Sequence, residues 1–390
     1  MPPITTENNL LVYQGCNFLK QRLILSVLSG KPIKIIDIRD NSIDPGLKEY
    51  EISLIRMIDK ITNGTKIELD STGTSLYFSP GLLHGGLLTH DCCVERNIGY
   101  YLEALIALGP FCKEPINAKL RGVTNSSESP SVDYVKQSAI PLLKKFLIVD
   151  DGLEMHIIKR GLKPSGGGEI SFKCPVRKNI RAIQFVKSGM VKRIRGIVFG
   201  CKVSPALGNR AVESAKGVML NFLPDVYINT DQNRGKTSGN SPGYGISLVA
   251  ETTDGVFYGA EGVYDVTEKG ENLITPEDLG KDVAFKLIDE IYRGGCVDSS
   301  FQWLASLYIA LGEKNISKFL TGPLSQYTIN FLQHLRDFFA ITFKLSNIEE
   351  EEEEEEAEGG NNSKDRDREC LQVLMTCVGV GYKNISKRII

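Results

Sequence analysis

The sequence predicts an α+β fold in which three repeated αβαββ sheet-and-helix units pack together and carry a small inserted α+β domain. Two observations lead to this prediction. Segments with helical and strand-like apolar periods recur in the same order three times along the 390-residue chain. A run of alternating strands with one helix interrupts that order between the second and third copies. The chain is long enough for two or three domains with cores of their own.

The first unit begins with a helical pattern, which ends at a Ser-Gly pair. A Pro-Gly turn precedes the second helix of the unit. A hairpin with a Ser-Thr-Gly turn closes the unit. The predicted elements are helix Gly15–Leu28, strand Ile33–Ile38, helix Leu47–Ile61 and hairpin strands Lys66–Leu69 and Ser75–Ser79.

The second and third units repeat this order, with Gly-Pro or Pro punctuation at the helix ends. The second unit is predicted to contain helix Cys92–Leu108, strand Ile116–Arg121, a helix from Pro130 to Phe146, and strands Leu153–Arg160 and Glu169–Cys174. The third is predicted to contain helix Val297–Leu311, strand Ile316–Leu320, helix Leu324–Phe339, and strands Ile341–Leu345 and Leu371–Val380.

The insertion runs from about Ile180 to Thr275 and reads as a compact α+β domain. Its predicted elements are strands Ile180–Val186 and Val191–Phe199, helix Pro205–Leu220, and strands Gly245–Glu251 and Val256–Glu261. The chain therefore divides into repeats one and two at 1–179, the inserted domain at 180–275 and the third repeat at 276–390.

Charge is distributed unevenly along the chain. The net charge is −2, but residues 349–358 hold nine glutamates, which leaves +7 on the rest. This run predicts a disordered acidic loop from about 347 to 369, because like charges repel and bury no area. Between Met155 and Asn240, 16 basic residues face 4 acidic ones. This excess of positive charge favours binding of an anionic partner over a basic surface that only keeps the protein soluble. Lys192, Arg193 and Arg195 are the predicted RNA or partner contacts.

Several classes of protein are disfavoured. No run of 18 apolar residues indicates a membrane span, and the N-terminus lacks the regions of a secretory signal. The nine cysteines show no CxxC spacing, and the four histidines show no paired metal spacing. The sequence therefore predicts a protein of the cytosol or nucleus that binds no metal.

One stretch, Thr321 to Leu345, has the layout of a helix-borne site. Gly322-Pro323 forms a turn, and an amphipathic helix follows. Backbone amides at such a helix start can bind an anion or present a nucleophile. The residue there is Gln326, whose amide is not a nucleophile. His334 lies about 12 Å further along the helix, too far to replace it, and is predicted to be a structural or surface histidine.

Arg336 and Asp337 on the same helix, with Asp298, suggest a rival chemistry. They could supply the general acid and base of an RNA endonuclease. Adjacent opposite charges on a helix more often form a solvated face, so the catalytic interpretation is the weaker one.

Several short segments, taken together, resemble RNA 3′-terminal phosphate cyclases. The resemblance covers nearly the whole chain in order, and it implies that family's fold of three repeated units with a small inserted domain. The matching segments are Ile38-Arg39 with Pro45-Gly46-Leu47, Phe78-Ser79-Pro80-Gly81, Gly122-Val123-Thr124-Asn125, Pro164 to Gly168, and Ser241 to Glu251.

The positions that carry the family's chemistry differ here. The enzymes adenylate a histidine in a pattern like His-Leu-Leu-Thr-Asn, whereas this chain has Gln326-Tyr327-Thr328-Ile329-Asn330. Their Glu-Gly-Gly-Gly-Gln corresponds to Tyr13-Gln14-Gly15-Cys16-Asn17, and their Asp-Gln to Phe301-Gln302. The arginine expected two residues after Asp40 is Ser42. A carboxamide nitrogen has no available lone pair, so retained cyclase activity is the least favoured of the three functions considered.

The pattern instead resembles the cyclase-like, non-cyclase branch of this family. That resemblance implies a cofactor-free nucleolar factor of small-subunit biogenesis, acting in early pre-rRNA cleavages towards 18S rRNA. The implied partners are a nucleolar GTPase and the pre-rRNA with the U3 snoRNP in the small-subunit processome. The amides of the altered site could still hold an anion, with Arg39, Arg96 and Gln326 as predicted lining residues.

Overall fold

The computed structural model describes residues 4–5, 10–147, 151–264, 274–347 and 372–384. Its helices and mixed sheets confirm the predicted α+β class. The acidic loop predicted at about 347–369 lies, from residue 348 onward, outside the described residues. Within the described ranges, no helix combines the length and the apolar character needed to cross a membrane.

The N-terminal part of the chain forms one sheet with two helices. Its elements are β1 (Ile4–Thr5), β2 (Leu11–Gln14), α1 (Leu19–Ser29), β3 (Ile33–Ile36), α2 (Glu49–Ile61), β5 (Lys66–Leu69) and β6 (Leu76–Ser79), beside a short ribbon of β4 (Thr62–Asn63) and β7 (Leu82–Leu83). The strand order is β1-β2-β3-β6-β5. β2 and β3 are parallel because α1 carries the chain back between them, and β3, β6 and β5 pair antiparallel.

The second sheet has the order β10-β11-β9-β8. Its elements are β8 (Gly85–Asp91), α3 (Ile98–Leu108), β9 (Glu114–Gly122), α4 (Val132–Tyr134), α5 (Ile140–Phe146), β10 (Glu154–Lys159) and β11 (Gly168–Cys174). The helix predicted from Cys92 begins at Ile98, because the Asn97 side chain caps it by accepting from the Tyr100 amide. Strand β8 was not predicted. The single helix predicted to Phe146 is divided by a π-helical turn at Val135–Ala139.

The third sheet has the order β12-β17-β19-β18. Its elements are β12 (Gln184–Phe185), α8 (Gln302–Leu311), β17 (Ile316–Thr321), α9 (Gln326–Phe339), β18 (Lys344–Asn347) and β19 (Val373–Val378). The prediction of a strand at Ile180–Val186 within the inserted domain is wrong. Only Gln184–Phe185 form a strand, β12, and it pairs with β17 of the third sheet and not with the inserted strands. Each of these three sheets contains one parallel pair, followed by two antiparallel neighbours. The first strand of the parallel pair, which is β2, β8 or β12, is missing from the predicted αβαββ unit.

The inserted sheet has the order β14-β13-β15-β16. Its elements are β13 (Val191–Cys201), α6 (Pro205–Met219), β14 (Val226–Asn233), β15 (Gly243–Thr252), β16 (Phe257–Val263) and the covering helix α7 (Pro276–Arg293). β14 and α7 were not predicted. α6 and α7 bury Ala211, Ala215, Val283 and Leu287 against the sheet in one core. A boundary at residue 275 would therefore separate α7 from the sheet that it covers.

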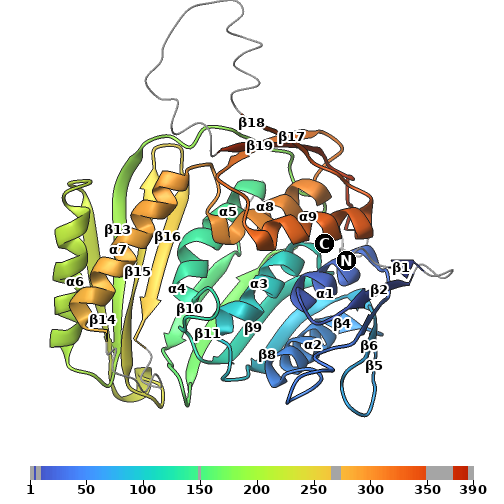
Figure 1. The fold of residues 1–390 in the computed structure, drawn as a ribbon, viewed down its shortest axis with the longest axis horizontal. Helices are drawn as coiled ribbons and strands as arrows, with labels where there is room; N and C mark the ends of the chain where they lie inside the picture. Colours follow the sequence, from blue (N-terminus) through green and yellow to red (C-terminus); the bar gives the residue numbers. More distant parts are fainter. Residues whose placement is uncertain (1–3, 6–9, 148–150, 265–273, 348–371, 385–390) are drawn as a thin grey trace, which may run out of the picture.

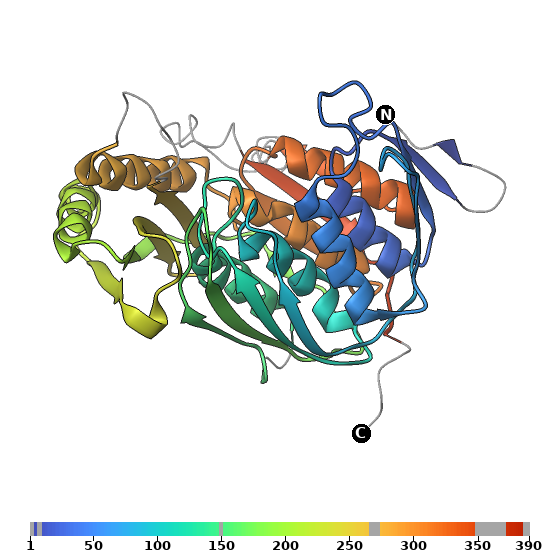
Figure 2. The ribbon, with the colours of Figure 1, turned by 90° about the horizontal axis from the view of Figure 1, so that it is seen from below.

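Three helices make up the centre of the molecule. α1, α3 and α8 have buried residues all round, as expected for helices enclosed by other elements. Figure 1 shows the first sheet at one end, the inserted sheet with α6 and α7 at the other, and the third sheet along the upper edge. Figure 2 shows the central helices lying over the first and second sheets.

An ionic cluster, made of a buried Arg160–Asp133 pair and the half-exposed Asp231, joins the second sheet to the inserted sheet. Arg160, directly after β10, donates to both carboxylate oxygens of Asp133 at 2.6 and 2.9 Å and to Asp231 of β14 at 2.6 Å. The side chains of Arg160 and Asp133 are only 3% and 1% exposed. Beside this cluster, the Tyr134 hydroxyl donates to Asp298 at 2.5 Å. These bonds fix the inserted sheet against the rest of the chain.

Candidate functional site

The start of α9 is built by capping and by one buried glutamine. The Ser325 hydroxyl accepts from the Thr328 amide, which is the expected cap of a helix that begins at Gln326. Gln302, 1% exposed, donates to the Thr321 hydroxyl and the Pro323 carbonyl, and its oxygen accepts from the Ser325 amide. These hydrogen bonds hold the turn before α9 in a defined conformation. The first residue of the helix, Gln326, supplies no nucleophile there.

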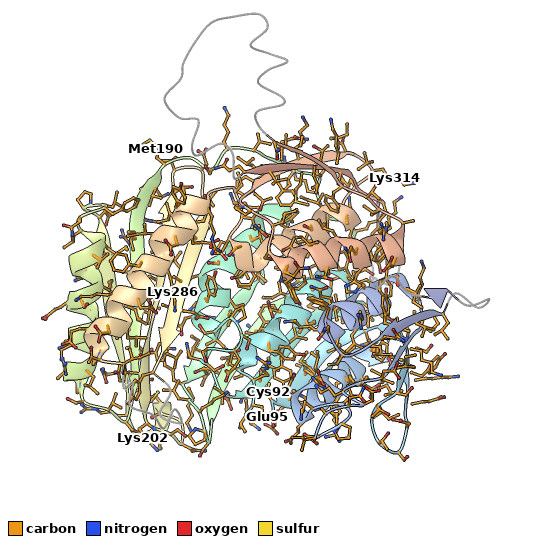
Figure 3. All side chains as sticks on the ribbon, in the orientation of Figure 1. Cys92, Glu95, Met190, Lys202, Lys286 and Lys314 are labelled. Carbon is orange, nitrogen blue, oxygen red and sulfur yellow. The ribbon has the colours of Figure 1, made fainter. Side chains whose placement is uncertain are left out.

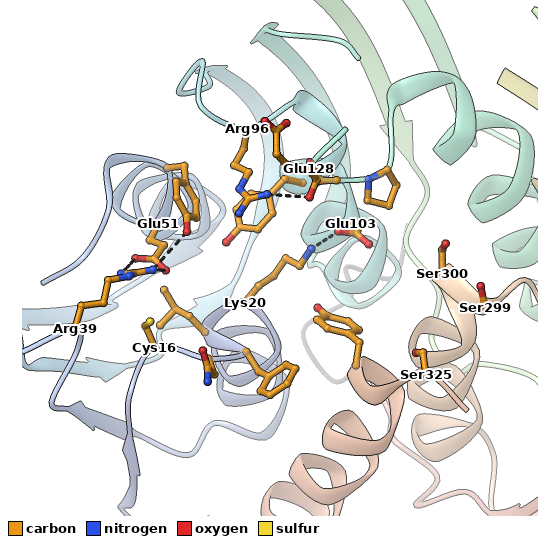
Figure 4. Close-up of a pocket in the computed structure, with 18 residues that line it drawn as sticks. Cys16, Lys20, Arg39, Glu51, Arg96, Glu103, Glu128, Ser299, Ser300 and Ser325 are labelled. Atoms are coloured by element: carbon orange, nitrogen blue, oxygen red, sulfur yellow. Dashed lines mark hydrogen bonds and ion pairs between the residues drawn. The ribbon is translucent and has the colours of Figure 1, made fainter. Parts of the chain in front are cut away.

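A pocket of about 550 Å³ lies beside this helix start. It opens between α1, α2, α3 and α9, as Figure 4 shows. The side chains that line it come from segments far apart in the sequence: Cys16, Asn17, Phe18, Leu19, Lys20, Arg39, Tyr50, Glu51, Arg96, Tyr100, Glu103, Glu128, Ser129, Pro130, Ser299, Ser300, Ser325 and Tyr327.

The cations of this pocket have partners within the pocket. Arg39 binds both carboxylate oxygens of Glu51 at 2.7 Å, and these bonds raise the pKa of the Arg39 guanidinium. Lys20 is ion-paired with Glu103. Arg96 donates to the Glu128 carbonyl at 2.8 Å. Three basic and three acidic side chains line the space, so an entering anion would compete with resident carboxylates.

Two of the three predicted anion-pocket residues meet in this pocket. Arg39 and Arg96 line it, whereas Gln326 is exposed and is not among the lining residues. An anion held by all three stays a prediction. Sequence reasoning missed Lys20 and Glu103, and no local signal could have found them, because they are 83 positions apart and meet only in the folded chain.

A second cleft, of about 500 Å³, contains the residues of the endonuclease hypothesis. Arg336 and Asp337 line it together with Arg22 and His334. The Tyr13 hydroxyl donates to Asp337 at 3.3 Å, and burial raises the pKa of the Asp337 carboxyl. Arg336 itself is exposed. Among the described residues, no group of His, Cys, Asp and Glu has an arrangement that could hold a metal ion.

His334 is buried in this cleft and is structural. Its Nε2 accepts from Arg22 Nε at 3.4 Å, and its Nδ1 lies 2.9 Å from Gln21 Oε1. Burial, with the nearby charge of Arg22, lowers the pKa of His334 to about 3. The imidazole therefore stays neutral at physiological pH, and the alternative of a surface histidine is wrong.

The lowered pKa of His334 predicts a pH-dependent stability. Unfolded histidine titrates near pH 6.5, so between pH 6.5 and 3 the unfolded state binds more protons. The stability contributed by neutral His334 is thus present above pH 6.5 and is lost as the pH falls. Relative to His334→Gln, we expect the wild-type free energy of unfolding to drop by roughly 3 kcal/mol between pH 7 and 4. Urea unfolding at several pH values measures this.

His156→Gln, at an exposed position of β10, is the control for losing a histidine. A difference between wild type and His334→Gln that stays constant from pH 7 to 4 would contradict the buried, neutral imidazole.

The predicted RNA or partner contacts lie on one strand of the inserted sheet. Lys192 and Arg193 both pair with Glu251, at 2.7 and 2.5 Å. Arg195 pairs with Asp225 at 2.8 Å, and this hydrogen bond raises the pKa of Arg195. All three are at least one-third exposed, so the pairs are open to competition. Two carboxylates, Glu251 of β15 and Asp225 just before β14, already offset two of the three positive charges.

Comparison with known proteins places the chain in a family. The family model for RNA 3′-terminal phosphate cyclase matches residues 11–345. A probable RNA 3′-terminal phosphate cyclase-like protein of Drosophila melanogaster is 66% identical over the full length of both chains. The human RNA 3′-terminal phosphate cyclase-like protein is 51% identical over 98% of this chain and 99% of its own. The rRNA processing protein rcl1 of Schizosaccharomyces pombe is 41% identical over 97% of this chain and 98% of its own. The chain therefore belongs to the RNA 3′-terminal phosphate cyclase family, with relatives in its cyclase-like branch.

Proposed function

We propose that this chain is a non-catalytic factor of small ribosomal subunit biogenesis that acts in rRNA processing in the nucleolus. The observation that carries the proposal is the match, over nearly the full length of both chains, to a protein named for rRNA processing. In finer detail, the chain supports the early pre-rRNA cleavages that release 18S rRNA. It does so by binding a nucleolar GTPase and the pre-rRNA with its U3 snoRNP.

The chemistry of the α9 start supports a non-cyclase role. Covalent nucleotidyl transfer needs a nucleophile with an available lone pair, and the nitrogen lone pair of the Gln326 carboxamide is delocalised into its carbonyl group. The side chain is also exposed and lies outside the pocket beside the helix. Within that pocket, Lys20 and Arg39 are engaged by Glu103 and Glu51. The fold around the site is thus retained as a scaffold for binding.

Two measurements test this proposal. Incubation of the purified chain with ATP labelled in the α-phosphate is expected to leave no covalent AMP on the protein, because position 326 offers no nucleophile. Capture of the tagged chain from nuclear extract is expected to recover pre-rRNA, U3 RNA and a GTPase. A labelled adduct would contradict the loss of cyclase chemistry. Capture without any of these partners would contradict the role in small-subunit biogenesis.

Cleavage of pre-rRNA by the chain itself is the second candidate function. The cleft that Arg336 and Asp337 share with Arg22 favours it, because the raised pKa of Asp337 suits a general acid. Purified chain with a pre-rRNA fragment distinguishes the two functions. A specific cut that Arg336→Ala and Asp337→Ala each abolish would establish the nuclease. No cut, or a cut that survives both substitutions, leaves the binding role.

A further inference from the structure

Strand β14 forms one edge of the inserted sheet, and among the described residues no strand pairs with its outer side. It runs parallel to β13 over eight register pairs without a shift, from Val226 to Asn233. Figure 3 labels Met190 and Lys202, which stand directly before and after β13, at the two ends of this pair. β14 therefore presents a continuous edge of eight residues.

The hydrogen bonds to β13 identify which backbone groups of β14 point away from the sheet. Ile194 of β13 donates to the Asp225 carbonyl at 2.9 Å, so the odd-numbered residues of β14 bond to β13. Because these groups alternate along a strand, the even-numbered residues direct their N–H and C=O groups outward. In the part of the chain that the structure describes, no partner accepts from the outward N–H groups, which belong to Ile228, Thr230 and Gln232.

The other edge strands of the four larger sheets are short, bulged or bound by a side chain. In the described ranges, β1 and β12 have two residues each, and β5 and β18 have four. β8 and β10 each contain a register shift. The Gly259 N–H of β16 donates to the Asp298 carboxylate at 2.7 Å instead of to a strand. Such devices prevent edge-to-edge pairing, and β14, which also lacks lysine and proline, has none of these three.

Exposed apolar side chains lie at the start of β14. Leu220 and Phe222, in the turn between α6 and β14, are 54% and 46% exposed, and Tyr227 in the strand is 58% exposed. Tyr227 lies on the sheet face opposite α6, because its neighbour Ile228 packs into the core under the helices. A strand added to this edge would cover apolar surface as well as backbone groups.

The free edge and the apolar residues together define the partner. N–H and C=O groups on every second residue, about 6.6 Å apart, match the backbone of another extended polypeptide. A second copy of this chain fits poorly. A two-fold pair of β14 strands would place Leu220 and Phe222 of one copy near the exposed Arg234 and Lys236 of the other. An extended segment of a different protein, apolar where it passes the start of β14, fits both features.

We propose that the outer edge of β14 is a docking site for an extended segment of a partner protein, which adds to the inserted sheet as a fifth strand. The segment is expected to carry β-branched or aromatic side chains, which suit a strand. The inference goes beyond the proposed function, because it needs neither rRNA nor the GTPase and holds for any protein that offers such a segment.

The test selects, on the full chain, phage that display random peptides of about 12 residues, long enough to span β14. Selected peptides are synthesised with a fluorescent label, and their affinity is measured by anisotropy. Thr230→Pro removes the central outward N–H and leaves the bonds to β13 in place, as proline on an edge strand allows. This variant is expected to bind the peptides at least about tenfold more weakly, because a hydrogen bond is lost and the ring blocks close approach. The matched control Thr230→Val keeps the N–H and is expected to bind like wild type.

Amide hydrogen exchange followed by NMR gives a second readout, which needs no variant and so decides the matter even if Thr230→Pro misfolds. In the free chain the amides of Ile228, Thr230 and Gln232 are expected to exchange quickly, and bound peptide is expected to slow them by at least about tenfold. The inward amides of Tyr227 and Asn229 are expected to exchange slowly in both states, because they bond to β13.

Three results would overturn the inference. The first is that no selected peptide loses affinity on Thr230→Pro. The second is that bound peptide leaves the exchange of the outward amides unchanged. The third is slow exchange of these amides in the free chain together with a dimer in sedimentation velocity, which would make a second copy the occupant. None of these results bears on the adenylation assay or the pre-rRNA capture that test the proposed function.

Discussion

Replacing Arg160 with methionine is expected to lower the free energy of unfolding by roughly 3–5 kcal/mol. The guanidinium holds Asp133, which is 1% exposed, with two hydrogen bonds and also reaches Asp231 of the inserted sheet. Methionine fills a similar volume but leaves the Asp133 carboxylate charged and unpaired inside the protein. The cost of that buried charge dominates the effect. Urea unfolding followed by circular dichroism and by the fluorescence of the single tryptophan measures it.

The control for Arg160 is Arg121→Met. Arg121 also pairs with a carboxylate, Glu169 at 2.9 Å, but its side chain is 48% exposed. Water solvates the partner that remains, so a change within about 0.5 kcal/mol is expected. Arg160→Lys keeps the charge without the forked geometry and is expected to fall between the two. Similar stabilities for Arg160→Met and Arg121→Met would contradict the predicted cost of leaving the Asp133 carboxylate buried and unpaired.

Replacing Gly99 with alanine is expected to destabilise the chain by about 3 kcal/mol or more. A Cβ atom at this position in the first turn of α3 would lie 1.8 Å from the carbonyl oxygen of Pro130. The obstacle is backbone, so the segment of Ser129 and Pro130 must move by more than about 1 Å to restore ordinary contact distances. Asn97 binds that segment through the Ser129 carbonyl at 2.6 Å, so the movement also strains the helix cap. Urea unfolding, with the same two signals, measures the loss.

The matched control is Gly217→Ala in α6. A Cβ there meets nothing within 4 Å, so the substitution replaces only a flexible helical residue by the best helix former. It is expected to raise the free energy of unfolding by about 0.5–1 kcal/mol. Destabilisation of similar size at both positions would mean that the close approach of α3 to Pro130 is not what requires glycine at position 99.

The elements that sequence reasoning found and missed differ in how local their signals are. The hairpin strand Lys66–Leu69 and the α1 stop at Gly30 were predicted because a turn or a left-handed glycine marks each within a few residues. β8 was missed because Gly85 and Gly86 open it and look like a turn. α7 carries a clear helical period with the Thr275 cap, but the sequence does not say which sheet it covers.

In the candidate site, too, the features with a local sequence signal could be predicted and those that depend on distant residues could not. Gln326 can be identified as a missing nucleophile from the sequence alone, because nucleophilicity is a property of the side chain itself. The pocket beside it could not be described in this way. Its Lys20–Glu103 and Arg39–Glu51 pairs join residues that only folding brings together, and they decide how much positive charge the pocket has left for an anion.

The sequence by itself determined the α+β class, the family resemblance and the absence of a nucleophile at position 326, because periodicity, turn chemistry and side-chain type are local properties. Only the tertiary structure decided which basic side chains are ion-paired with which carboxylates. Lys192 and Arg193 pair with Glu251 of the neighbouring strand, and Lys20 pairs with Glu103, 83 positions further along the chain. The physical reason is that a charge's effective field depends on its neighbours in space, and those are set by strand register and helix packing and not by sequence distance.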